Sequence, residues 1–238
     1  MQGGESVKGC PVGLLMLDTR IPRIPGDIGN PATFDFPLRY YRVPGASPEL
    51  VVRVGARELV PLFVEGARIL EQEGVRAITT SCGFLARFQS ELAEAVRIPV
   101  FTSSLMLVPL VHRMVGPGRA VGVMTVEAKS LGPAHFAGAG ITADMRVVVA
   151  GLEDEEEFTR VLLGDLPTLD VEAARSEHVK VARRLVQAHP EIDAIVLECT
   201  NMPPYREDVR AATGRPVFDI TTLVRMVRDA VEPRRYAD

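Results

Sequence analysis

The stretch Ile192-Asp193-Ala194-Ile195-Val196-Leu197-Glu198-Cys199 is a short apolar run that ends in a cysteine, and it has a counterpart earlier in the chain. The counterpart is Val75-Arg76-Ala77-Ile78-Thr79-Thr80-Ser81-Cys82, whose alanine, first isoleucine and cysteine coincide with those of the later run. The offset is 117 (199 minus 82), and it also carries Pro99-Val100-Phe101 onto Pro216-Val217-Phe218. Because the repeat has the length of a domain, we infer that the chain arose by gene duplication.

Apolar runs alternate with helical patterns along both halves, which is typical of an α/β fold with mainly parallel sheets. A second offset, 109, relates Val12-Gly13-Leu14 to Val121-Gly122-Val123. We therefore expect about four strands in each half and two similar domains related by pseudo-twofold symmetry, with the active site in the cleft between them. Residues 1–103 plus 218–238 are predicted to form the first domain, and residues 104–217 the second.

Capping residues and apolar residues at helical spacing place the helices. Asp170 is expected to cap a long helix that ends near Ala188. The acidic run 153–157 fits the solvated first turn of another helix better than a metal site, because no histidine or ordered spacing of oxygen ligands accompanies it. The other helices are expected at about 58–73, 84–96, 105–115, 129–138 and 206–212, and from 220 onward.

The segment from Arg20 to Val43 is rich in proline and glycine and is predicted to be a long loop. Long loops inside compact domains are usually functional. Two interpretations stay open: a connector that packs on the surface, or a wall or lid over a site at the end of the first strand.

Composition excludes several classes of partner. The chain has 238 residues and a net charge of −4, with 47% hydrophobic residues and no tryptophan, so nucleic acid and anionic membranes are not expected partners. No apolar run reaches the ~18–20 residues that a membrane span needs. The N-terminal segment, residues 1–8, lacks the features of a signal peptide. We therefore expect a cytoplasmic protein.

Cys82 and Cys199 are the candidate catalytic residues. In open parallel sheets ligands bind beyond the carboxyl ends of the strands, where both cysteines stand. Each precedes a helical segment or tight turn, whose N-terminal dipole is expected to lower the thiol pKa. Cys10, by contrast, is expected to be a buried or edge residue. Three cysteines in a chain of this length do not indicate a disulfide framework.

Two thiols on opposite sides of a ligand suit the inversion of a carbon acid. One thiolate removes the proton beside a carboxylate, and the other thiol supplies a proton. The resulting enediolate needs hydrogen-bond donors aimed at the carboxylate oxygens. The candidate substrate-binding residues are small or lie at strand ends, apart from Phe84, which would make the site more apolar: Asp18, Ser81, Gly83, Phe84, Thr125, Thr200 and Asn201.

No metal or cofactor is expected. The histidines at positions 112, 135, 178 and 189 stand at metal-ligand spacing neither with each other nor with a cysteine. No Gly-x-Gly-x-x-Gly or phosphate-binding loop follows a strand. The expected partner is a small-molecule carboxylate substrate.

The cysteine blocks, the stretch Val121-Gly122-Val123-Met124-Thr125 and the duplication resemble the aspartate/glutamate racemase superfamily over nearly the whole chain. The resemblance implies two α/β domains with the active site between them, no cofactor, and Cys82 and Cys199 as the acid/base pair. It implies a cofactor-independent racemase or epimerase of an amino acid or related carbon acid. A homodimer or higher homo-oligomer is common among such proteins.

The chain also departs from that pattern. Gly83 and Phe84 follow the first cysteine where amino-acid racemases usually have Asn and Thr, and Asn201 stands where some glutamate racemases carry His. A dicarboxylate would need a second cation, for which the sequence offers five candidates: Arg20, Arg23, Arg87, Lys129 and Arg206.

Two alternatives to the racemase remain open. One is an isomerase like maleate isomerase, which adds a nucleophilic cysteine to a double bond. The other is a non-catalytic two-domain binder of small molecules. An arylmalonate decarboxylase of the same superfamily keeps one thiol only, so the pair of cysteines argues against that activity.

Overall fold

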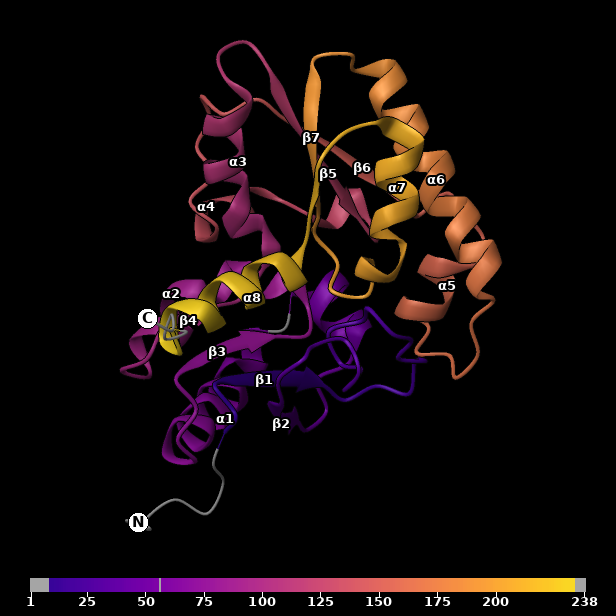
Figure 1. The fold of residues 1–238 in the computed structure, drawn as a ribbon. Coiled ribbons are helices and arrows are strands. Elements are labelled where there is room, and N and C mark those ends of the chain that lie inside the picture. The colour runs from indigo at the N-terminus through magenta and orange to yellow at the C-terminus, as the bar shows by residue number, and fades with distance from the viewer. Residues whose placement is uncertain (1–8, 56, 234–238) are drawn as a thin grey trace, which may run out of the picture.

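The computed structural model describes residues 9–55 and 57–233, and these form two similar α/β domains (Figure 1). Each domain has a four-stranded, fully parallel sheet, so the predicted fold class is confirmed. Residues 1–8, in which the sequence predicts no signal peptide, lie outside the described residues.

The two sheets have the same topology. Their strand orders are β2-β1-β3-β4 and β6-β5-β7-β8, so every strand of the second sheet has a counterpart in the first. The edge strands β4 and β8 lie at the offset of 117 found in the sequence. The strands are β1 (Val12–Leu17), β2 (Leu38–Val43), β3 (Ala77–Thr80), β4 (Val100–Phe101), β5 (Ala120–Thr125), β6 (Val147–Gly151), β7 (Ile192–Leu197) and β8 (Val217–Phe218).

Helices cover both faces of the sheets, as Figure 1 shows for α3 on one side of the second sheet and α6 and α7 on the other. The α-helices are α1 (Val60–Gln72), α2 (Gln89–Glu94), α3 (Val108–Val115), α4 (Pro133–Gly138), α5 (Phe158–Leu163), α6 (Val171–Ala188), α7 (Arg206–Thr213) and α8 (Ile220–Val231). Short helical segments are Leu50–Val54, a π-helical turn, and the 3-10 turns Arg57–Leu59, Gly83–Phe88, Ser104–Leu107, Ala128–Ser130 and Pro203–Tyr205.

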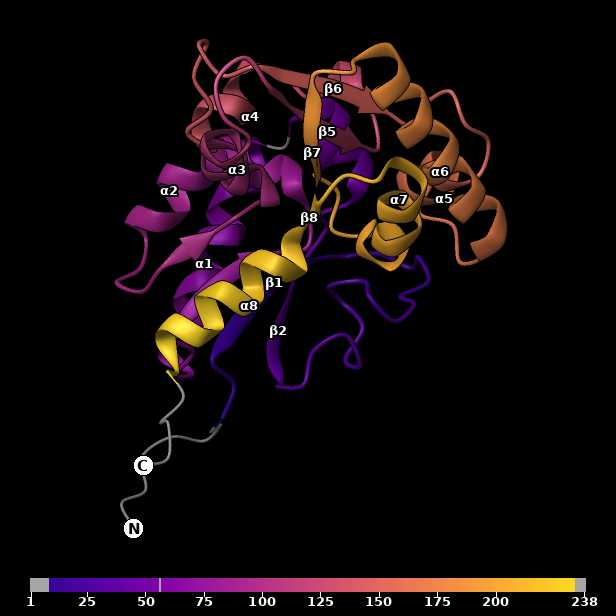
Figure 2. The ribbon, with the colours of Figure 1, turned by 45° about the horizontal axis from the view of Figure 1, so that its top comes forward.

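The last helix returns to the first domain. Figures 1 and 2 both place α8 over the first sheet, and it contacts β3. The preceding strand β8 pairs with β7 in the second sheet. The predicted domain boundary between residues 217 and 218 therefore falls inside a strand, and the chain crosses between domains just after it.

A glycine in each central strand explains how a helix packs closely on it. A Cβ atom on Gly13 of β1 would lie 3.0 Å from the Leu70 side chain of α1. A Cβ atom on Gly122 of β5 would lie 3.1 Å from the Leu185 side chain of α6. Interiors are packed to crystal-like density, so each glycine makes room for the helix above it. The two copies solve this packing problem in the same way.

The loop predicted from Arg20 to Val43 is too long, because its last six residues form β2. Leu38 and Val43 are buried at the ends of this edge strand, while Arg39 and Arg42 reach towards solvent. The charged residues and the Pro/Gly-rich stretch before them hid the strand pattern. The rest of the segment has no regular structure.

Of two predictions about the starts of helices, one is confirmed and the other is wrong. Asp170 caps α6 as predicted, because its side chain accepts hydrogen bonds from the backbone N–H groups of Glu172 and Ala173. The acidic run 153–157 precedes α5 and does not form its first turn, since α5 begins at Phe158.

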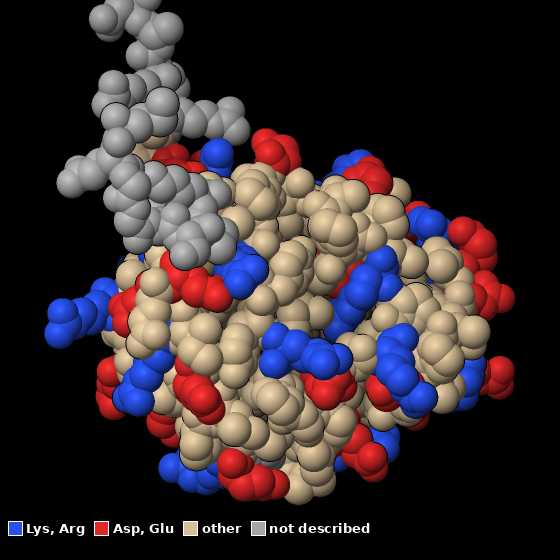
Figure 3. Space-filling view, turned by 90° about the horizontal axis from the view of Figure 1, so that it is seen from below, with Lys and Arg blue, Asp and Glu red and all other residues tan. Residues whose placement is uncertain are grey.

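Charges of both signs are interspersed on the face seen in Figure 3. Within residues 9–55 and 57–233, no helix combines the length and the apolar character needed to cross a membrane.

Candidate active site

The carboxyl ends of β3 and β7 meet at one pocket, which holds about 380 Å³ of empty space including its mouth. Cys82 and Cys199 both line it, one from each domain. The polar lining residues are Thr19, Arg23, Ser81, Cys82, Glu198, Cys199 and Asn201. The others are Leu17, Ile21, Pro48, Val52, Gly83, Phe84, Val126, Leu162 and Leu163, so most of the wall is apolar.

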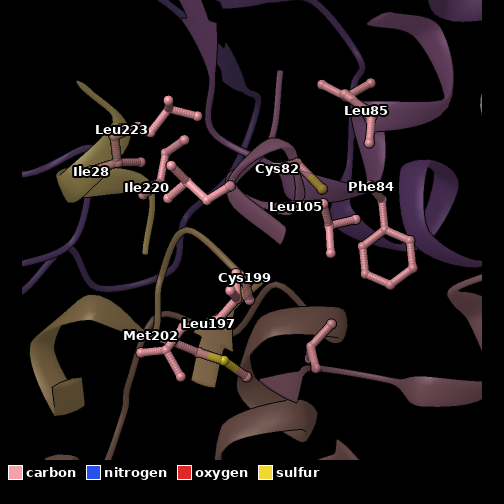
Figure 4. Close-up of a cluster of buried hydrophobic side chains, with 14 of the residues drawn as sticks. Ile28, Cys82, Phe84, Leu85, Leu105, Leu197, Cys199, Met202, Ile220 and Leu223 are labelled. Carbon is pink, nitrogen blue, oxygen red and sulfur yellow. The ribbon is translucent and has the colours of Figure 1, made fainter. Parts of the chain in front are cut away.

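Strand ends fix both thiols. Cys82 follows β3 in extended conformation and begins the 3-10 turn Gly83–Phe88. Its backbone N–H donates to Thr80 Oγ1 at 3.4 Å. Cys199 follows β7, and its carbonyl accepts a hydrogen bond from the N–H of Met202 in the next turn. Figure 4 shows the two cysteines on facing segments among buried hydrophobic side chains.

Burial, and not the neighbouring helical turns, dominates the thiol pKa values. Burial and the charge of Glu198 raise the pKa of Cys82 to about 12, although the Phe84 N–H and Arg23 act in the opposite direction. Burial and Glu198 also raise the pKa of Cys199 well above its usual value, and the charge of Asp27 adds to this. The expectation of lowered thiol pKa values is therefore wrong for the unliganded pocket, because desolvation outweighs the backbone N–H groups.

Glu198 is a buried acid in the same pocket as the two cysteines. Its side chain is 0% exposed, and Thr125 Oγ1 donates to its Oε2 at 2.7 Å. Burial raises the pKa of this carboxyl to about 7, while the hydrogen bond from Thr125 lowers it. From the sequence, Glu198 was recognised only as part of the block that contains Cys199. The available signal was an acid placed directly after four apolar strand residues, where a charge is costly to bury.

Arg23 brings a positive charge to the pocket. Its Nη1 donates to Asp27 Oδ1 at 3.2 Å and its Nη2 to Thr19 Oγ1 at 2.8 Å. Asp27 is buried and also accepts a hydrogen bond from the Asn201 side chain. Burial raises the pKa of Asp27, and Arg23 acts against that rise. This network joins the loop after β1 to the strand end that carries Cys199.

The pocket brings together the two cysteines and four of the candidate substrate-binding residues: Ser81, Gly83, Phe84 and Asn201. Phe84 is buried and adds to the apolar wall. Ser81 Oγ accepts a hydrogen bond from the Leu17 N–H at 2.8 Å. Asn201 Oδ1 accepts from the Cys199 thiol at 3.6 Å.

Three other candidates lie outside the lining, and their contacts are with the protein. Thr125 donates to Glu198, and Thr200 Oγ1 donates to the Ser81 carbonyl at 2.6 Å. Asp18 pairs with Arg42 at 3.4 Å near the surface. Thr125 and Thr200 therefore support residues that line the pocket, whereas Asp18 does not contribute to it.

Of the five candidate cations, Arg23 alone lines the pocket. Arg20 pairs with Asp165 and Arg206 with Asp219. Ile21 and Arg23 both belong to the Pro/Gly-rich segment, which therefore forms part of the pocket wall. In the part of the chain that the structure describes, no group of three or more His, Cys, Asp or Glu side chains could hold a metal ion.

Comparison with known proteins gives three kinds of match. A family described as Asp/Glu/Hydantoin racemase matches residues 45–226. A solved structure of a mutant of arylmalonate decarboxylase superposes with a TM-score of 0.63 at 18% identity, with 96% of each chain covered. This likeness concerns the fold.

Curated relatives are more similar in sequence. A protein of Durusdinium sp. clade D named dimethylsulfoniopropionate lyase is 35% identical over 239 residues, which cover 97% of this chain and 78% of the relative. Dimethylsulfoniopropionate lyase 6 of Emiliania huxleyi (strain CCMP1516) is 34% identical over 94% of this chain. The matched region spans 61% of that relative, which is less than two thirds of its length.

Proposed function

The chain belongs to the Asp/Glu/hydantoin racemase family, which is a family of enzymes. We propose that it is a lyase that cleaves dimethylsulfoniopropionate into dimethyl sulfide and acrylate. The observation that carries the proposal is a mostly apolar pocket with two thiols and one arginine. The names of the relatives with 34–35% identity support the same substrate.

The substrate combines a carboxylate with a dimethylsulfonium group on the β carbon. A base takes a proton from the α carbon, and the C–H electron pair becomes the double bond of acrylate. The C–S bond to the β carbon breaks, and its electron pair leaves with neutral dimethyl sulfide. The proton stays on the base, so each turnover ends with one proton to be released.

Arg23 is the carboxylate-binding group of this proposal. It is the only Lys or Arg among the described residues that line the pocket. A guanidinium can bind a carboxylate with two parallel hydrogen bonds and stabilise the charge that develops on the enediolate. A dicarboxylic amino acid would need a second cation, so the pocket fits a monocarboxylate better than aspartate or glutamate.

Cys82 is the base of the proposal. Glu198 disfavours both thiolates and one backbone N–H favours each of them, but Arg23 favours the thiolate of Cys82, whereas Asp27 disfavours that of Cys199. Burial keeps both thiols protonated in the unliganded pocket. A bound sulfonium brings a positive charge of its own, which lowers the pKa of a neighbouring thiol.

The apolar wall suits the two methyl groups of the sulfonium. Phe84 presents an aromatic ring, and aromatic faces attract alkylated cations. Leu162 and Leu163 add aliphatic surface from the second domain. A leaving group that departs as a neutral, apolar sulfide needs no proton donor, so a wall of this kind is sufficient for it.

A racemase or epimerase of a small monocarboxylic carbon acid is the second candidate. The presence of two thiols in the same pocket favours it, because inversion uses one acid and one base. The two reactions differ in their products: elimination breaks a C–S bond, whereas racemisation only exchanges a proton at the α carbon.

The test is incubation of the purified protein with dimethylsulfoniopropionate, with dimethyl sulfide measured in the headspace and acrylate by NMR. We expect the two products in equal amounts, and none above background from a Cys82→Ala preparation. In a parallel assay in deuterated water, the D and L forms of alanine, a monocarboxylic amino acid, and of aspartate and glutamate should keep their α protons. Exchange at the α carbon of these amino acids without sulfide release would overturn the proposal in favour of the racemase.

A further inference from the structure

We propose that Glu198 is the internal proton acceptor of the pocket, which takes the proton from Cys82 so that a thiolate forms without a change in the net charge of the buried site. The inference rests on the proposed function, because elimination leaves a proton on the base at every turnover. Glu198 acts through Cys82 and is not assigned a contact with the substrate.

The first observation is an unpaired oxygen. Glu198 lines the pocket with a side chain that is 0% exposed. Thr125 satisfies Oε2, but Oε1 has no hydrogen-bond partner among the described residues. A buried acceptor without a partner costs roughly 1–3 kcal/mol, so a merely structural residue at this position would be better apolar.

The second observation is where that oxygen lies. A Cβ atom on Gly83 would come within 2.1 Å of Glu198 Oε1 and within 2.4 Å of the Glu198 carbonyl oxygen. Only a glycine leaves room for the carboxyl at this place. The free oxygen therefore packs against the residue that follows Cys82, while the backbone of Glu198 continues directly into Cys199. The carboxyl therefore contacts the chain neighbour of Cys82 and belongs to the chain neighbour of Cys199.

The third observation is electrostatic coupling. The charge of Glu198 is, after burial, the largest influence that raises the pKa of Cys82 and of Cys199. A carboxylate and a thiolate therefore disfavour each other in this desolvated space. The pocket tolerates one negative charge more readily than two. A pKa of about 7 makes Glu198 the group that carries this charge before the substrate binds.

These observations describe a closed proton cycle. The resting pocket has a Glu198 carboxylate and a Cys82 thiol. When the cationic substrate binds, the thiol proton moves to the carboxylate through one bridging water, because no direct hydrogen bond joins the two groups, and this gives a thiolate and a carboxylic acid. The thiolate takes the α proton and becomes a thiol again. After the products leave, the carboxylic acid loses its proton to water, and the carboxylate is restored.

Elimination needs such an acceptor more than racemisation does. A racemase returns a proton to its substrate at each turnover, so its two thiols exchange roles and no proton is released. A lyase must pass one proton per turnover out of a buried pocket. A carboxyl group with a pKa of about 7 can both accept and release this proton near neutral pH.

The experiment compares Glu198→Gln with the unmodified protein in two assays. The first measures alkylation of each cysteine by iodoacetamide between pH 6 and 10, with mass spectrometry and without substrate. The alkylation midpoint is the pH at which half of the cysteine is alkylated in a fixed time, which lies below the Cys82 pKa of about 12 because the small thiolate fraction reacts. Removal of the carboxylate charge should lower this midpoint for Cys82 by about one pH unit or more. The second measures dimethyl sulfide release, for which we expect a roughly 100-fold lower kcat and loss of the limb near pH 7 in the rate profile.

Thr125→Val provides a second variant that keeps the carboxyl. Loss of the hydrogen bond to Oε2 should raise the pKa of Glu198 and move the limb near pH 7 to higher pH. This variant also tests the inference if Glu198→Gln does not fold. A purely structural role would lower stability in both variants without moving the pH profile or the alkylation midpoint.

The outcomes separate the two proposals. An unchanged alkylation midpoint of Cys82 in Glu198→Gln, or an unmoved pH profile in Thr125→Val, would overturn the role of Glu198. A shifted alkylation midpoint without sulfide release by the unmodified protein would overturn the proposed lyase activity, yet it would support the control of the thiols by Glu198.

Discussion

The strand ends of the two domains share a scaffold but differ in chemistry. Ser81-Cys82-Gly83-Phe84 follows β3, and Glu198-Cys199-Thr200-Asn201 follows β7 at the same offset of 117. The cysteines coincide, whereas an acid replaces a serine before the second thiol and two polar residues replace Gly83 and Phe84 after it. The first strand end supplies apolar surface, and the second supplies most of the polar groups.

This difference teaches that the duplication has not produced a symmetric site. A reaction that interconverts mirror images is nearly symmetric, so it is well served by equivalent groups on both faces of the substrate. An elimination has one base and one leaving group, which need different surroundings. The different residues at the two strand ends therefore fit the proposed lyase better than a racemase.

The largest expected effect is a difference between the thiols. Cys82→Ala should lose about 10³-fold in kcat/KM for sulfide release, because it removes the base, whereas Cys199→Ala should lose only about tenfold. Steady-state kinetics of both variants would measure this. Equal losses of about 10³-fold would mean that both strand ends carry the chemistry, as a two-thiol mechanism requires.

A smaller effect is expected for Arg23, which lines the pocket from the first domain and has no counterpart in the lining from the second. Arg23→Met should raise KM by about 100-fold, since truncation of a buried charged pair costs 2–5 kcal/mol, and Arg23→Lys should recover part of the loss. Arg20→Met is the matched control, because Arg20 is exposed, pairs with Asp165 and lies outside the pocket lining. Unaltered KM values for both Arg23 variants would remove Arg23 from the carboxylate site.

The smallest expected effect concerns stability in acid and distinguishes the helices of the two domains. His178 on α6 is buried against Phe158 and Tyr205, and burial lowers its pKa to about 4. Helix α1 has no buried histidine. In the unfolded chain His178 has a pKa of about 6.5, whereas in the folded protein its pKa is about 4. Between these pH values the unfolded state binds more protons, so the free energy of unfolding falls as the pH drops from 6.5 to 4.

At pH 5 this difference corresponds to about 2 kcal/mol of unfolding free energy. Urea unfolding at pH 7 and pH 5 would measure it, and His178→Phe should reduce the difference between the two pH values by that amount. His189→Gln, at the partly exposed end of the same helix, is the control. A pH dependence that is the same in both variants would contradict the assignment to His178.

The sequence was sufficient for the scaffold because its signals are local. Apolar runs marked most of the strands, and the shared offset of Cys82 and Cys199 revealed the duplication. Strand β2 escaped because Arg39, Arg42 and two tyrosines make it look polar. Such an edge strand is recognised only once its neighbour β1 is known.

The polar part of the site depends on contacts between distant residues. Arg23 was one of five equivalent cations, and only the path of its loop, joined to Asn201 through Asp27, brings it to the pocket. Glu198 gained significance from Gly83, which lies in the other domain. Burial determines the thiol pKa values. Burial depends on the tertiary structure, so it could not be predicted from the helical turns next to the cysteines.

The contacts between the Arg23 loop and the second domain have a consequence for how ligands exchange. Asp27 binds the Asn201 side chain, the Ile28 N–H donates to the Thr200 carbonyl at 3.3 Å, and a Cβ atom on Gly26 would lie 2.9 Å from Pro204 Cα. The loop is thus bound directly to the second domain. A hinge opening of the two domains would break these contacts together with the rest of the domain interface. A movement of the loop alone would break only these contacts. We therefore expect the residence time of a ligand to depend on the contacts of this loop more than on the stability of either domain.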